Sequence, residues 1–154
     1  METNSSKLNG IVLYFLDLIV LGCVFICFGV GITTNSSVYA KHASIFDLTF
    51  GDYAVLPMTI IFFLLLLGVV LVGVAGTLLL MGKKAAPVLT IISGIEVFAV
   101  GMLYFFTWAF VSAATNSSCG LNVASIFNGV LLVLSGIITF FVGLASKATP
   151  LAAE

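Results

Sequence analysis

Four long stretches of this chain are almost free of charged residues, and each is long enough to cross a bilayer as a helix. They cover residues 11–32, 55–81, 88–111 and 123–144. A spanning helix needs about 20 apolar residues at a rise of about 1.5 Å each. Because backbone groups in lipid must be paired within the segment, helices are the form that fits runs of this length. The sequence therefore predicts an all-α membrane protein, an antiparallel four-helix transmembrane bundle that forms one domain over residues 1–154.

The balance of charged and apolar residues excludes a water-soluble fold. Charged residues make up 7% of the 154 residues and hydrophobic residues 62%, whereas a soluble chain carries about 25% charged residues. The net charge of -1 and the absence of Arg give no basis for binding nucleic acid. We expect the lipid bilayer, other membrane proteins or copies of this chain as partners, and neither nucleic acid nor a small-molecule substrate.

The distribution of lysines predicts the orientation of the bundle. Four of the five lysines fall on the side of the two termini: Lys7, Lys83, Lys84 and Lys147. Only Lys41 falls on the other side. Positive residues accumulate on the cytoplasmic side, so both termini and the turn at 82–87 are predicted to be cytoplasmic. Gly82 suits the end of a helix, and Pro87 suits the first turn of the next one.

The two loops on the opposite side, 33–54 and 112–122, each contain an Asn-Ser-Ser sequon. The acceptor residues are Asn35 and Asn116. Their position in these two loops agrees independently with the orientation predicted from the lysines. Glycosylation at these sites would make the chain a glycoprotein of the plasma membrane or an endomembrane.

The cysteines and the single histidine predict no catalytic or metal site. One His and three Cys do not complete a four-ligand zinc site without carboxylates. Cys23 and Cys27, one turn apart, are interpreted as small apolar residues. Cys119 is alone in the second outer loop, which favours a free thiol or a bond between chains, with Cys27 as a further partner to consider. Without a nucleophile and base set or a phosphate loop, we expect no enzyme and no cofactor.

Small residues recur at intervals of seven within the predicted helices. They are Gly22 and Gly29 in the first, Gly68, Ala75 and Gly82 in and after the second, Gly94 and Gly101 in the third, and Gly129, Gly136 and Gly143 in the fourth. A step of seven returns to nearly the same helix face, and small residues there let two backbones approach closely. The pattern predicts tight helix packing; the alternative is that glycine is simply frequent in membrane helices.

Asp17 and Glu96 are the only charged residues in the four stretches, and no Lys or Arg lies there to pair with them. A carboxylate in hydrocarbon costs about 2.5–3.5 kcal/mol on insertion scales. From the inner ends of their helices, Asp17 lies about 10 Å deep and Glu96 about 12–14 Å deep. If the two carboxyls share one site, they do not both ionise easily, so at least one is expected to be neutral. Ser93 is a candidate hydrogen-bond partner of Glu96, and Asn128 is a further polar group in the fourth helix.

Two hypotheses account for these acids. They are either part of a proton or cation path, or neutral groups that hold helices together by hydrogen bonds worth about 0.6–2 kcal/mol each. A path needs polar groups that reach both surfaces, but residues 11–16 before Asp17 and 97–99 after Glu96 are nearly all apolar. The sequence therefore favours the structural hypothesis.

Several of these features occur in the order in which a known family of four-span proteins carries them. They are the stretch Tyr14-Phe15-Leu16-Asp17, the glycines Gly22 and Gly29, the stretch Gly73-Val74-Ala75-Gly76, and the stretch Ser93-Gly94-Ile95-Glu96. In this order the chain resembles the tetraspanins over about residues 8–113. The second outer loop differs, because that family has a large loop with a Cys-Cys-Gly motif where this chain has Ser118-Cys119-Gly120.

The resemblance implies a bundle with cytoplasmic termini that acts without catalysis. We therefore expect a membrane scaffold, a self-assembling structural protein or an accessory subunit of a membrane complex, which organises its partners by helix packing within the bilayer. The alternative hypothesis is a proton- or cation-conducting protein that uses the intramembrane carboxyls.

Overall fold

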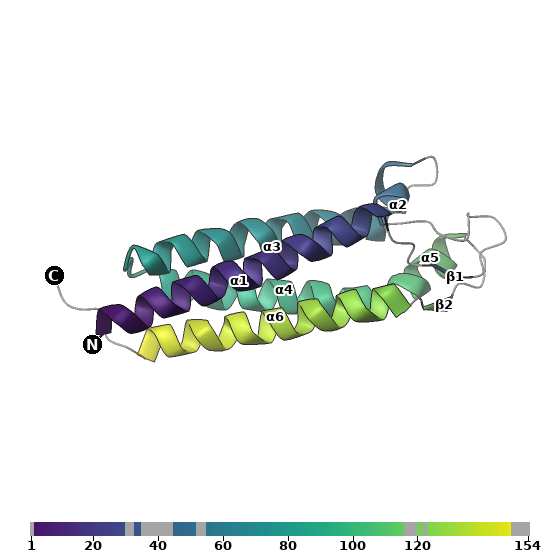
Figure 1. The fold of residues 1–154 in the computed structure, drawn as a ribbon. Coiled ribbons are helices and arrows are strands. Elements are labelled where there is room, and N and C mark those ends of the chain that lie inside the picture. The colour runs from purple at the N-terminus through teal and green to yellow at the C-terminus, as the bar shows by residue number, and fades with distance from the viewer. Residues whose placement is uncertain are drawn as a thin grey trace.

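Four long helices form the body of the protein. The computed structural model describes residues 2–29, 33–34, 45–51, 55–115, 120–121 and 123–148. The long helices are α1 (Glu2–Gly29), α3 (Leu56–Leu80), α4 (Ala86–Phe105) and α6 (Val123–Ala148). All four are long and apolar enough to cross a membrane, and they lie side by side in an antiparallel bundle (Figure 1). The predicted all-α membrane bundle is confirmed, and the chain is an integral multi-pass membrane protein.

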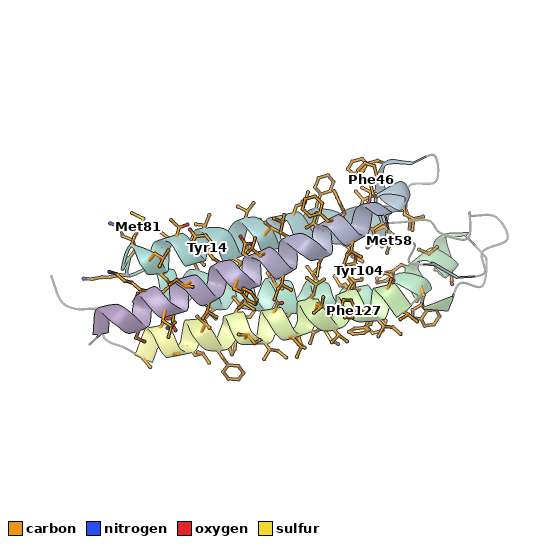
Figure 2. All side chains as sticks on the ribbon, viewed as in Figure 1. Tyr14, Phe46, Met58, Met81, Tyr104 and Phe127 are labelled. Carbon is orange, nitrogen blue, oxygen red and sulfur yellow. The ribbon has the colours of Figure 1, made fainter. Side chains whose placement is uncertain are left out.

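The four helices form a closed ring in which α1 and α4 each pack against both α3 and α6. Apolar side chains from all four fill the interior, with Leu13, Val72, Val97 and Leu132 almost completely buried. Large apolar side chains also cover the outside of the bundle, as Figure 2 shows. A helix that is apolar on all sides is typical of a membrane span.

The two ends of the bundle differ. One end holds the start of α1, the turn between α3 and α4, and the end of α6, and we call it the turn end (Figure 1). The other, the loop end, holds the short helices α2 (Asp47–Phe50) and α5 (Thr107–Thr115) and the two-residue strands β1 (Thr33–Thr34) and β2 (Gly120–Leu121). β1 and β2 pair antiparallel. This pairing links the segment after α1 to the segment before α6.

The turn between α3 and α4 has the predicted chemistry. Gly82 adopts the left-handed conformation with φ 66°. Its N–H donates to the carbonyl of Leu79 at 3.1 Å, and the N–H of Lys83 donates to the carbonyl of Leu78 at 3.0 Å. These two bonds satisfy carbonyls at the end of α3 in a Schellman motif. Pro87 lies in the first turn of α4, as the sequence predicts.

The continuous third helix predicted over residues 88–111 is interrupted. α4 ends at Phe105, and α5 begins at Thr107. The hydroxyl of Thr107 donates to the carbonyl of Tyr104 at 2.8 Å, and the N–H of Phe106 donates to Leu103 at 3.0 Å. A side-chain bond of this kind competes with the helical ladder and bends the helix. Hydropathy does not reveal the break, because the residues on both sides are apolar.

The first helix begins at Glu2, well before the apolar stretch that starts at residue 11. Its polar first turns are held by contacts with other helices. The hydroxyl of Ser6 donates to the carbonyl of Leu79 at 2.7 Å, and the amide of Asn9 donates to the hydroxyl of Ser146 at 2.8 Å. The second and fourth helices begin within one residue of their predicted starts, and α6 continues past residue 144 to Ala148.

An aromatic cluster that the sequence did not predict covers the start of α3 at the loop end. The rings of Phe46 and Phe50 pack on Phe62 and Phe63, with centroids 4.9 to 6.2 Å apart. Beside them, Ile45 is completely buried. The cluster fixes α2 against the bundle.

Candidate functional site

Asp17, on α1, contacts α3 beside Gly73. A Cβ atom at Gly73 of α3 would stand 3.0 Å from its Oδ2 atom, so a side chain at position 73 would require the carboxyl group to shift by a few tenths of an ångström. The Oδ1 atom is buried and has no hydrogen-bond partner among the described residues. The contact of Asp17 with α3 is therefore a packing contact at Gly73, and no described residue donates to Oδ1.

Glu96 has the same arrangement on the other side of α3. A Cβ atom at Gly68 would stand 2.7 Å from its Oε2 atom. Both carboxyl oxygens are buried, and neither has a hydrogen-bond partner in the described part of the chain. The expected bond with Ser93 is absent, because the Ser93 hydroxyl donates to the carbonyl of Thr90 at 3.0 Å within its own helix.

The two acids contact α3 on different flanks. Gly68 and Gly73 are five residues apart, which corresponds to about 7.5 Å along the helix and about 140° around it. The structure thus brings both acids to one helix but not to one shared site. The premise of two carboxyls in a common low-dielectric site is not met by this arrangement.

A polar patch lies on the turn-end side of Asp17. The hydroxyl groups of Tyr14 and Thr77 are 2.7 Å apart, and the Thr77 hydroxyl donates to the carbonyl of Gly73 at 2.9 Å. Both Tyr14 and Thr77 are exposed on the bundle surface; Figure 2 shows Tyr14 on α1, with α3 beside it. We call Tyr14, Asp17 and Thr77 the α1–α3 polar patch. The apolar run 11–16 therefore carries one polar contact in the folded chain, which Tyr14 makes with Thr77 of α3.

Asn128 belongs to a strip of buried polar side chains along α6. Its amide donates a long hydrogen bond of 3.5 Å to the carbonyl of Cys23 on α1, and its Oδ1 atom has no partner among the described residues. The other members of this α6 polar strip are Ser125, Ser135, Thr139 and Ser146, all buried. Their spacing places them on one helix face, a signal that sequence analysis missed because only Asn128 was singled out.

The tightest helix contact is made by glycines of α4 and α6. All five face the other helix: Gly94, Gly101, Gly129, Gly136 and Gly143. A Cβ atom at Gly94 would stand 2.5 Å from the backbone nitrogen of Phe140, and one at Gly136 would overlap the backbone nitrogen of Phe98. The two backbones are therefore in direct contact, which is the role predicted for small residues at this spacing.

The remaining predicted packing residues behave differently. Gly68 faces the carboxyl of Glu96, and Ala75 is completely buried. A Cβ atom at Gly22 would meet nothing within 4 Å, so Gly22 lies on an open face in this chain. Gly29 ends α1, and its surroundings lie outside the described residues.

Other predicted sites cannot be placed in the fold. Asn35, Asn116 and Cys119 lie outside the described residues. Within the described ranges, no group of three or more His, Cys, Asp or Glu side chains is arranged to hold a metal ion.

Comparison with known proteins adds no further constraint. No family model, curated protein or solved structure matches the chain. The resemblance to tetraspanins therefore stays an expectation from the residues, and function must be argued from the sites themselves.

Proposed function

We propose that the protein is a non-enzymatic scaffold or accessory subunit of a membrane complex, which associates with its partners through the bilayer-embedded faces of its helices. The observation that carries this proposal is the separation of Asp17 and Glu96. Each contacts α3 beside its own glycine, and the described residues offer no donor to Asp17 Oδ1 or to either oxygen of Glu96. Because these oxygens are buried within the chain itself and lie on different flanks of α3, the two acids form no shared polar site, which supports a structural role over conduction.

The contact between α4 and α6 supports a structural role. Their backbones touch at Gly94 and Gly136, so neither helix moves past the other without losing close packing. Helix association in lipid depends on such packing because lipid removes the usual hydrophobic drive. A rigid pair of helices suits a protein that holds partners in place.

The orientation proposed for this protein places the turn end in the cytoplasm. The turn end carries Lys83 and Lys84 between α3 and α4, Lys7 near the start of α1, and Lys147 in the last turn of α6. Four lysines at one end satisfy the positive-inside rule if that end is cytoplasmic.

Site-specific photo-crosslinking in native membranes tests the proposed association. A photoreactive residue at Phe15 or Leu18, whose side chains are 66% and 65% exposed, should give a defined product with another protein chain. The same residue at the fully buried Leu132 should react only within the chain. If every outward position yields only lipid adducts, the proposal is wrong.

The conduction hypothesis remains the second candidate because of the α6 polar strip. Ser125 Oγ, Asn128 Oδ1 and Thr139 Oγ1 are buried without partners in the described structure, and buried polar atoms of this kind are commonly satisfied by internal water. Proton flux into liposomes separates the two functions. The scaffold proposal predicts that liposomes containing the protein take up protons no faster than empty liposomes. A faster proton flux that disappears in the Asp17→Asn, Glu96→Gln double variant would favour conduction.

A further inference from the structure

We infer that the α1–α3 polar patch docks a transmembrane helix of a different protein, which presents a Lys or Arg side chain at the depth of Asp17. This inference rests on the proposed function and deepens it, because it names the surface and the chemistry of the partner. It is carried by the hydrogen bonds of Tyr14 and Thr77, by the position of the Asp17 carboxyl beside them, and by the lysine positions of this chain.

The patch has only acceptor capacity left. The single hydroxyl proton of Thr77 is directed to the carbonyl of Gly73, so in the pair with Thr77 the hydroxyl of Tyr14 is the donor. The Tyr14 oxygen then retains lone pairs, and the carboxyl of Asp17 becomes acceptor-only when a cation beside it keeps it ionised. The complement of such a patch is a group that only donates. Lys and Arg are the side chains that carry several donors and no acceptor.

Charge complementarity points in the same direction. An unpaired carboxylate in lipid is costly, and so is an unpaired Lys or Arg on a partner helix. Pairing the two groups in a low-dielectric environment offsets part of both costs. The patch is open to such a partner, because Tyr14 and Thr77 are exposed and Asp17 is only partly buried.

A second copy of this chain does not supply the cation. No Lys or Arg lies in the four apolar stretches, and two copies with the same orientation carry their lysines at the same depth. On α1 the nearest lysine is Lys7, ten residues before Asp17, or about 15 Å along the helix. The partner is therefore a different protein, and the role it favours is accessory subunit over self-assembly.

The surface around the patch is apolar, as a partner helix in lipid requires. The Asp17 carboxyl lies beside Gly73, and the sequence neighbours Leu18 and Val74 are exposed. Side chains of one helix pack into the groove between ridges of another. A cationic side chain on such a helix approaches the exposed part of Asp17 from the lipid side, since the Oδ1 atom is buried.

The test uses the full chain in liposomes and a synthetic single-span peptide of Leu and Ala. One peptide carries a single Lys at the depth of Asp17, and its matched control carries Leu there. Energy transfer between labels on the two molecules measures their association. The Lys peptide should bind about tenfold tighter or more, because the ion pair forms in a low-dielectric medium. Equal binding of the two peptides would overturn the inference.

Two conservative variants locate the effect. Asp17→Asn should remove the preference for Lys, whereas Glu96→Gln should leave it unchanged, because the Glu96 oxygens are buried on the other flank of α3. Thermal unfolding of each variant checks that the bundle is intact. A Lys preference that survives Asp17→Asn in a folded bundle would also overturn the inference.

Failure of the inference and failure of the proposed function have different signatures. If the photo-crosslinks in native membranes are retained with Asp17→Asn, and the peptides show no Lys preference, the polar patch is not the docking site but the association stands. If no outward position of the wild-type chain gives a protein crosslink, the proposed function itself fails.

Discussion

The carboxyl group of Glu96 on α4 lies directly over Gly68 on α3, so close that a Cβ atom at position 68 would stand 2.7 Å from Oε2. Asp17 and Gly73 repeat this relationship at 3.0 Å on the opposite flank of the same helix. In both pairs a glycine leaves room for the carboxyl group. α3 is therefore the helix around which the two intramembrane acids are arranged.

Gly68→Ala should destabilise the bundle by about 1 kcal/mol, the low end of the range for overpacking. The cost stays small because the new methyl group displaces the flexible end of the Glu96 side chain. Thermal unfolding in mild detergent measures it. Gly22→Ala is the matched control, since a Cβ atom there meets nothing within 4 Å, and it should be neutral or slightly stabilising. Equal losses at positions 68 and 22 would contradict the close contact with Glu96.

Gly94→Ala should cost more, about 3 kcal/mol, because the added methyl group meets the backbone of Phe140 and not a movable side chain. The same unfolding measurement applies. The expected order of destabilisation is position 94 above position 68 above position 22. A Gly94→Ala protein as stable as Gly22→Ala would show that α4 and α6 are not in backbone contact.

Hydropathy predicts the fold because a long apolar segment in lipid must pair its backbone groups within itself, and the helix is the regular structure that does so. The packing role of the seven-residue glycine pattern is also predictable, because helical geometry alone determines the faces on which Gly94 and Gly136 lie. Hydropathy does not predict which helix flank an acid contacts. That depends on where Gly68 and Gly73 lie relative to neighbouring helices, which is a tertiary fact.

Polar contacts between helices were missed for a similar reason. Tyr14 and Thr77 are 63 residues apart, and no local pattern relates them. The break at Phe106 is accompanied by a bond from the Thr107 hydroxyl to the carbonyl of Tyr104, and the apolar composition on both sides conceals it. The α6 polar strip was detectable, because Ser125, Asn128 and their neighbours recur at helical spacing.

Tyr14→Phe and Thr77→Val together should reveal a coupling of about 0.6 kcal/mol, the average for hydrogen bonds between membrane helices. The physical reason is that each single change removes the same 2.7 Å bond between α1 and α3. A double-mutant cycle of unfolding free energies measures the coupling. Thr90→Val is the control, because its hydroxyl bonds only within α4, to Ala86. Additive effects of Tyr14→Phe and Thr77→Val would contradict the pairing.

Thr139→Val should leave stability unchanged or raise it. Its hydroxyl is buried with no partner in the described structure, and an apolar group of the same shape avoids the cost of burying an unsatisfied polar atom. Ser6→Ala is the contrast, because it removes a 2.7 Å bond to α3 and should lower the unfolding free energy by about 0.6 kcal/mol. A clear loss of stability in Thr139→Val would instead indicate water in the α6 polar strip.

The orientation is tested through the two sequons. If the loop end faces outward, enzymatic removal of glycans should increase the electrophoretic mobility of the chain. Changing both Asn35 and Asn116 to Gln should abolish that shift. A glycan on an Asn engineered between Lys83 and Pro87 would contradict the proposed orientation, because that turn is expected to be cytoplasmic.

Native mass spectrometry of the protein released gently from its own membrane tests the central claim most directly. The account predicts a complex in which this chain is joined to a different membrane protein, and a loss of that complex with Asp17→Asn but not with Glu96→Gln. A lone, folded copy of this chain under conditions that preserve other membrane complexes would contradict the account.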